Sequence, residues 1–184
     1  MQPVATELFT VTDYRAMPEG PPYYQLVQGK LIMAPSPNSF HQDVAFNVAF
    51  MLRQHVMKHR LGKVCIAPLD VYLSDIDVFQ PDVFFLSNQN LHLQKEDGVH
   101  GAPDLVVEIV SPSNGPLEKK RKRPLYARHG VKEEWLIDPV LEQIHRYDFT
   151  MDTAKPVRIV DSEETFETPL LPGLVISATE VFRR

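Results

Sequence analysis

The sequence predicts an α/β domain in which helices pack against a mixed β-sheet. Three features of the 184-residue chain lead to this fold class. Apolar residues recur at every fourth position over about residues 40–61, as they do on one face of an amphipathic helix. Short β-rich runs bounded by turns fill the middle of the chain. A second helical segment and two further strands follow. From the chain length we expect a single domain over residues 1–184.

The elements before the long helix are short. Thr12 can cap a helix over residues 13–17, which ends at the proline- and glycine-rich run 18–22. A hairpin follows, with a tight turn at Gln28-Gly29. Its two strands are expected over residues 23–27 and 30–33.

The long helix carries signals at both ends. Asn38 or Ser39 can cap its start, and Gly62 follows its end. Its repeating apolar residues are Phe40, Val44, Val48, Leu52 and Val56.

The rest of the chain consists mainly of predicted strands. A helix is expected between Pro116 and His129, with Gly130 as its stop, and residues 179–184 predict a last helical turn. The expected strands are residues 63–67, 70–73, 82–86, 105–110, 134–137 and 143–149.

Composition restricts the classes of function. Hydrophobic residues make up 43% of the chain and charged residues 23%, which is ordinary for a soluble globular protein. No apolar stretch approaches a membrane span, and the N-terminus lacks the pattern of a signal peptide. The single cysteine, Cys65, cannot form an intrachain disulfide, so a reducing cytoplasm is the expected location.

The net charge of −5 argues against an indiscriminate polyanion binder, which needs an extended basic surface. It does not exclude a nucleic-acid enzyme, whose own carboxylates are neutralised by bound metal. The cationic run over residues 119–123 can supply a local positive patch. The alternative explanation of that run, without a role in binding a substrate, is a solvated surface or an import signal.

Two acids stand in apolar β-like contexts. Glu108 lies inside the run over residues 105–110, and Asp82 opens the run over residues 82–86. An unpaired buried carboxylate is costly, so such residues usually have a partner. Two acids on neighbouring strands, with a lysine beyond them, can hold a hard divalent cation beside a phosphate. The pattern therefore indicates a metal-dependent nuclease.

In these residues the chain resembles the Uma-type restriction-endonuclease-like family, a domain of unknown function in the PD-(D/E)xK nuclease superfamily. The pieces that match cover nearly the whole chain from Tyr23 onward in order and spacing. They are residues 24–31, His41, Pro81-Asp82-Val83, residues 101–113, Lys122, Tyr126, residues 130–139 and residues 171–174.

The resemblance implies a restriction-endonuclease-like mixed sheet flanked by helices. It implies that Asp82 and Glu108 are acidic ligands of Mg²⁺, with Mn²⁺ as a substitute, and that the backbone carbonyl of Ile109 is a third ligand. The expected activity is hydrolysis of phosphodiester bonds in DNA. The alternative is that both acids have structural roles only: Asp82 caps a strand and Glu108 pairs with an internal cation.

The catalytic lysine departs from the superfamily pattern, because Val110 stands where the lysine two residues after the acid is expected. The family moves this lysine into the following helix, four residues before a tyrosine, which points to Lys122. Glu118 is then its neighbour one turn earlier. Pro124 falls inside the same helix, so we expect the helix to kink or to begin there. The other cations of the run over residues 119–123 are alternatives to Lys122.

Gln25 stands where the family usually has a glutamate that can join the metal site. Glutamine keeps the length and loses the charge, so metal affinity should fall. This leaves a second hypothesis, a catalytically degenerate nucleic-acid or protein interaction module that keeps the nuclease fold. His41 matches the family and can approach the acidic site, although capping or packing at the helix start explains it equally well.

A homodimer is the expected assembly. Cutting both strands of a duplex needs two sites of opposite polarity, and two-fold homodimers are the commonest solution. The suspected interface surfaces are the hairpin over residues 23–33 and the apolar tail over residues 170–175.

Overall fold

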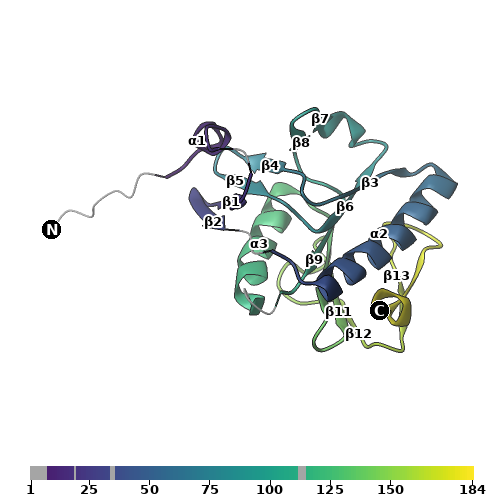
Figure 1. The fold of residues 1–184 in the computed structure, drawn as a ribbon. Helices are drawn as coiled ribbons and strands as arrows, with labels where there is room; N and C mark the ends of the chain where they lie inside the picture. Colours follow the sequence, from purple (N-terminus) through teal and green to yellow (C-terminus); the bar gives the residue numbers. More distant parts are fainter. Residues whose placement is uncertain (1–7, 19, 34–35, 112–114) are drawn as a thin grey trace.

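The computed structural model describes residues 8–18, 20–33, 36–111 and 115–184, with residues 115–120 described by their backbone alone (Figure 1). Two six-stranded sheets and a two-stranded ladder make up the β-structure. The central sheet runs in the order β12 (Arg158–Val160), β11 (Gln143–Asp148), β10 (Glu133–Asp138), β9 (Leu105–Ile109), β6 (Val83–Ser87) and β3 (Gly62–Ile66). The second sheet runs in the order β2 (Lys30–Met33), β1 (Tyr24–Val27), β5 (Asp77–Phe79), β4 (Val71–Ser74), β8 (Gly98–His100) and β7 (Gln94–Lys95). The ladder pairs β13 (Thr165–Glu167) with β14 (Val175–Ser177).

Both large sheets are mixed, as the sequence predicted. In the central sheet β9 is parallel to β10 and antiparallel to β6, and the remaining neighbours are antiparallel. In the second sheet only β4 and β8 are parallel. The helices are α1 (Val11–Arg15), α2 (Ser39–His59), α3 (Gly115–His129) and α4 (Ala178–Val181), with a 3-10 turn over Leu91–Leu93. No helix in the described ranges is long and apolar enough to span a membrane.

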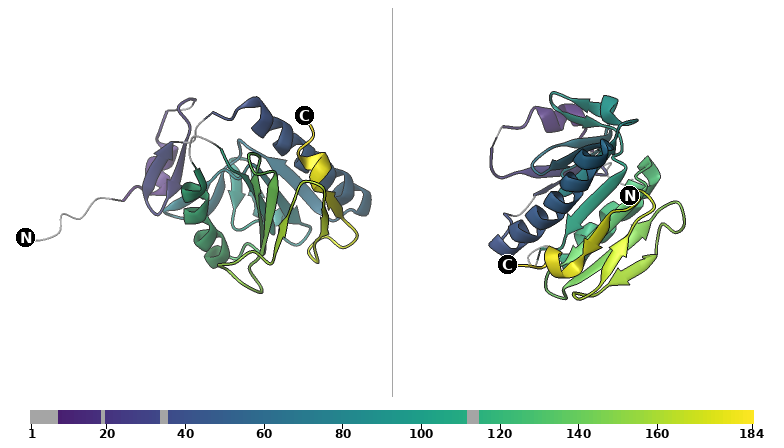
Figure 2. Two further views of the ribbon diagram at one scale, coloured as in Figure 1. Left: turned by 90° about the horizontal axis from the view of Figure 1, so that it is seen from below. Right: turned by 90° about the vertical axis from the view of Figure 1, so that its right-hand side faces the viewer.

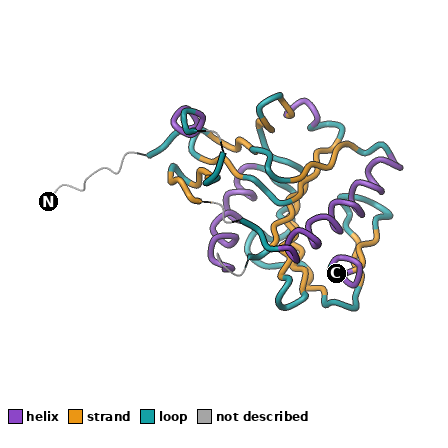
Figure 3. The backbone as a smooth tube through the Cα atoms, in the orientation of Figure 1, coloured by secondary structure: helices purple, strands orange, loops and turns teal. Residues whose placement is uncertain are grey.

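The two longer helices cover opposite faces of the central sheet (Figures 2 and 3). Along β9 the alternation of a strand sends Leu105, Val107 and Ile109 into the core under α2 and Val106 into the core beside α3. Glu108 shares the parity of Val106, so it points to the α3 side. This alternation decides which helix can supply a partner for the buried acid.

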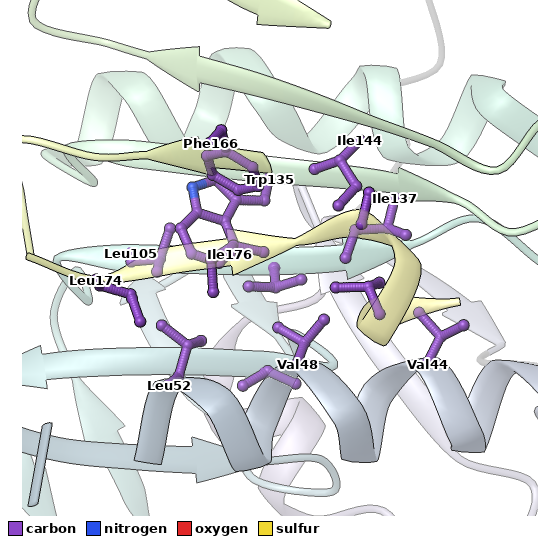
Figure 4. Packing of buried hydrophobic residues seen from close by; sticks show 14 of the residues in the cluster. Val44, Val48, Leu52, Leu105, Trp135, Ile137, Ile144, Phe166, Leu174 and Ile176 are labelled. Atoms are coloured by element: carbon purple, nitrogen blue, oxygen red, sulfur yellow. The ribbon is translucent and has the colours of Figure 1, made fainter. Parts of the chain in front are cut away.

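The core under α2 contains the repeating apolar residues that the sequence indicated. Val44, Val48, Leu52 and Val56 belong to one buried cluster with residues of the central sheet. In this cluster the ring of Trp135 meets Phe166 of β13 edge to face (Figure 4). Burial of such side chains supplies roughly 1.5–3 kcal/mol each. The second core lies between the two sheets and α3, where Phe79, Phe84, Leu125 and Tyr126 meet.

The ends of α2 are set by backbone conformation. Asn38 caps the start, accepting a hydrogen bond from the N–H of His41. The helix ends at Arg60 in the left-handed conformation rather than at Gly62, which begins β3. A Cβ at Gly62 would lie 2.0 Å from the carbonyl oxygen of Leu86, so only glycine fits this close approach of β3 to β6.

One expectation about a helix was wrong in detail. The first helix is capped by Thr10 rather than Thr12, because Thr10 forms a reciprocal capping box with Asp13. For Pro124 the sequence left two alternatives, a kink and a helix start, and the structure excludes the second. Helix α3 runs through this proline from Gly115 to His129, so the helix does not begin there.

The hairpin is confirmed, with Gln28 and Gly29 both at positive φ in its turn. Several short strands were missing from the expectation, among them β5, β8 and β12 to β14. The apolar tail also differs from the expectation, because Leu171 and Leu174 are buried in the chain's own core. They therefore give no reason to place a dimer interface there.

Candidate active site

The pairing of β6 with β9 brings the two acids together. Val83 pairs with Val107, and continuing this antiparallel register by one residue sets Asp82 opposite Glu108. Opposite residues of an antiparallel pair point to the same face. Asp82 also contacts β9 directly, since its Oδ2 atom accepts a hydrogen bond of 2.7 Å from the N–H of Ile109.

Glu108 is held by α3. Its side chain is fully buried, and its Oε1 atom accepts a hydrogen bond of 2.6 Å from the hydroxyl of Tyr126. The Nζ atom of Lys122 lies 3.4 Å from the same oxygen. Lys122 and Tyr126 are one turn apart and therefore share a face of the helix. A buried carboxylate is tolerable when a cation and a donor satisfy it in this way.

Lys122 also connects the site to the second sheet. Its Nζ atom donates a hydrogen bond of 2.7 Å to Oε1 of Gln25 in β1, and lies 5.6 Å from the centre of the Phe79 ring. The N–H of Gln80 donates to the same Gln25 oxygen at 3.0 Å. The side chain that departs from the family pattern is thus in direct contact with the candidate lysine.

His41 approaches the acidic site from the first turn of α2. Its ring is buried, and its Nε2 atom lies 3.5 Å from Oδ1 of Asp82. The cap of α2 is made by Asn38, so the His41 ring is not needed for capping. The Nδ1 atom has no hydrogen-bond partner in the part of the chain that the structure describes.

Burial raises the pKa of Tyr126 well above its ordinary value of 10.0, and the negative charge of Glu108 and its hydrogen bond act in the same direction. The charges of Glu134 and Asp82 add to the rise. The phenol therefore remains a protonated donor to Glu108 at neutral pH. Both candidate acids act electrostatically on this one hydroxyl.

The cationic run divides into different roles where its side chains are described. Arg121 is exposed. Arg123 donates a hydrogen bond of 2.5 Å to Glu134 and stacks 3.5 Å from the centre of the Tyr147 ring. Of these three described cations, Lys122 alone contacts Glu108. The side chain of Glu118 lies outside the described part of the structure.

Sequence reasoning missed two contributions to the site. Tyr126 served only as a marker for the lysine, yet it makes the shorter contact with Glu108. Gln80 precedes Pro81-Asp82 and was not considered, although it orients Gln25. The second acid of the β9 segment, Asp104, has a structural use. It accepts hydrogen bonds from the N–H of Ser87 at 2.7 Å and from Lys132 at 2.6 Å.

The donors present suit a small hard cation. Throughout the described ranges, no three His, Cys, Asp or Glu side chains gather into a metal site. The oxygen donors near one another are the carboxylates of Asp82 and Glu108 and the amide oxygen of Gln25, with the carbonyl of Ile109 in the same strand as Glu108. Mg²⁺ is commonly held by one or two carboxylates while it keeps several waters, so this donor set fits it.

The mixed central sheet and its flanking helices form a restriction-endonuclease-like fold. The chain belongs to the Uma2 family, described as "Putative restriction endonuclease", whose model matches residues 11–179. A solved structure of a "putative nuclease belonging to DUF820" from Anabaena variabilis superposes with a TM-score of 0.80 at 20% identity, over 95% of this chain and 97% of that one. At that identity the likeness shows the fold alone. No curated protein sequence matches the chain.

Proposed function

We propose that the chain is a Mg²⁺-dependent endonuclease that hydrolyses phosphodiester bonds of DNA. The observations that support the proposal are the contact of Lys122 with Glu108 and the hydrogen bond to Asp82 from Ile109, the residue that follows Glu108. Two carboxylates beside a lysine are the groups that a phosphodiesterase needs for its ion and for the charge of its substrate.

In this proposal Asp82 and Glu108 hold the ion, assisted by the carbonyl of Ile109. When bound, Mg²⁺ supplies a water of lowered pKa and neutralises charge on the phosphate. The hydrogen bonds from Ile109 and Tyr126 orient the two carboxylates. Lys122 provides the positive charge that stabilises the phosphate as negative charge develops on it.

One observation favours the second candidate, a degenerate binding module. Lys122 is only 1% exposed and already donates to Gln25 and Glu108. A lysine that acts on a phosphate must come within reach of it. With the neutral Gln25 in place of an acid, a fold that binds nucleic acid without cutting it would show the same contacts.

Cleavage of supercoiled plasmid in Mg²⁺, in Mn²⁺ and in chelator tests the proposal. The wild type should nick or cut slowly with either metal and not in chelator, and Asp82→Asn and Glu108→Gln should be inactive. Asp104→Asn is the matched control, because it removes a buried carboxylate at the other end of β9. Full activity in Asp82→Asn would refute the site. Absence of both cleavage and carboxylate-dependent metal uptake in the wild type would favour the degenerate module.

The assembly and the location belong to the same proposal. A homodimer would supply two sites for cutting a duplex. Sedimentation at micromolar concentration tests it, and a strict monomer would restrict the activity to nicking or to cleavage of single strands. The one cysteine, Cys65, is free and buried, which is compatible with a reducing cytoplasm.

A further inference from the structure

A pocket of ≈ 110 Å³ runs along the first half of α2 and ends at Asp82. Its walls are apolar on one side, where Ala45, Phe46 and Ala49 of α2 lie across from Ile66 at the end of β3. Its polar lining residues are His41, Gln42 and Asp82. The pocket therefore joins an apolar wall to a carboxylate of the candidate active site.

The aromatic side chains beside this pocket are not used by the core. Phe46 is 70% exposed and Phe50 is 57% exposed, and their rings are stacked with centroids 6.4 Å apart and planes 17° apart. The buried face of α2 is formed by other residues: His41, Val44, Val48, Leu52 and Val56. Exposed apolar groups that are gathered at one place commonly mark a binding surface.

The polar part of the pocket also contains a ring nitrogen whose hydrogen bonding is unsatisfied within the described part of the chain. The buried Nδ1 atom of His41 has no hydrogen-bond partner over the described residues, although a buried ring nitrogen normally has one. The same part of the pocket carries the carboxylate of Asp82, which the proposed function assigns to Mg²⁺, so a phosphate would meet a bound cation there. An aromatic wall that leads to a metal-binding carboxylate is suited to a nucleotide.

We propose that this pocket receives an unpaired nucleobase of the substrate against Phe46 and sets the adjoining phosphate beside Asp82. Bases in an intact duplex stack on one another and cannot reach an aromatic side chain at the protein surface unless they leave the stack. Single-stranded or frayed DNA is therefore the preferred substrate, and intact duplex is the poorer one. The inference rests on the proposed function, since it specifies the substrate of that same site.

Binding of a fluorescent single-stranded oligonucleotide, and of the same sequence as a duplex, tests the inference in Ca²⁺, which neutralises the carboxylates as Mg²⁺ would. Phe46→Leu keeps apolar area and removes the ring, so affinity for the single strand should fall about tenfold, because stacking on one base contributes roughly 1–3 kcal/mol. Phe46→Tyr should retain the affinity, and duplex binding should be little changed by either variant. Met57→Ala is the matched control, because Met57 is 61% exposed on α2 and lies outside the pocket.

The outcomes separate this inference from the proposed function. If the wild type never cleaves but binds single strands through Phe46, the inference stands and the catalytic proposal fails. If it cleaves in an Asp82-dependent way while Phe46→Leu alters neither affinity nor the preference for single strands, the inference fails alone. Sedimentation tests whether a second copy of the chain occupies this face instead. A wild-type dimer that Phe46→Leu converts to monomer would assign this face to a second copy of the chain and overturn the inference.

Discussion

The Oδ2 atom of Asp82 accepts a hydrogen bond of 2.7 Å from the backbone N–H of Ile109. The residue that precedes Ile109 is Glu108, so the carboxylate of Asp82 is hydrogen-bonded to the strand backbone next to Glu108. Their relative position is therefore set by the pairing of β6 with β9 and not by a flexible loop.

Asp82→Asn should keep the fold and lose the charge. The amide oxygen of asparagine can still accept from Ile109, so the free energy of unfolding should fall by less than about 1 kcal/mol. Asp82→Ala leaves that N–H without an acceptor and should cost about 1–3 kcal/mol. Denaturant unfolding measures both values, and titration calorimetry should show that both variants lose metal uptake. Equal stability of the two variants would mean that this hydrogen bond contributes nothing.

Tyr126→Phe should lower stability by about 1.5–3 kcal/mol at neutral pH, because it removes a donor to a buried carboxylate. The raised pKa of Tyr126 also predicts how stability depends on pH. The folded state resists deprotonation of this phenol, so its contribution is complete below about pH 10 and is lost as the pH rises above that value. The difference in stability between the wild type and Tyr126→Phe should therefore shrink in alkali. Tyr23→Phe, which removes an exposed phenol, is the control. A difference that stays constant with pH would contradict the assignment.

Lys122→Met keeps most of the side-chain volume and removes a positive charge beside the buried Glu108. We expect a loss of about 3 kcal/mol in the free energy of unfolding. In the double variant with Glu108→Gln, the two losses should be much less than additive, because the charges interact with each other. Urea unfolding of the four proteins gives this coupling energy. Strict additivity would show that the pair does not interact.

Gln25→Glu should raise the affinity for Mg²⁺, because it places a third carboxylate within reach of Lys122 and Glu108. Gln54→Glu adds the same charge on the exposed face of α2 and should leave the affinity unchanged. Titration calorimetry compares the two variants. If Gln25→Glu does not strengthen binding, residue 25 does not face the ion and acts only on Lys122.

Asp104→Asn should reduce the stability of the protein above about pH 4. Burial raises the pKa of Asp104, but hydrogen bonds from Lys132, Ser87 and Asn90 outweigh burial and leave the pKa lowered. The contribution of a carboxyl group with a lowered pKa is present above its unfolded value of 3.8 and is lost as the pH falls below it. Acid unfolding curves should converge for the wild type and Asp104→Asn below that pH. Cleavage activity of the folded variant should be unchanged.

Local patterns were sufficient for the elements whose signals lie within a few residues. The apolar residues spaced four apart from Val44 to Val56 predicted the buried face of α2, and Gln28-Gly29 predicted the hairpin turn. These predictions succeeded because helix periodicity and positive φ are properties of short segments. The family resemblance likewise drew attention to Asp82 and Glu108 without any knowledge of the strand register.

Pairings between distant segments were decided by the tertiary structure. Short strands such as β5 and β8 have little periodicity of their own and exist because they pair with neighbours in the second sheet. Only the packing of α3 on the central sheet shows that Lys122, rather than a neighbouring cation whose side chain is described, contacts Glu108. The side chain of Glu108 points to the face of β9 that packs against α3. The contact of Gln25 with Lys122 joins β1 of the second sheet to helix α3. The sequence by itself determined the chemical groups and their local elements, whereas only packing in three dimensions decided which of those groups touch.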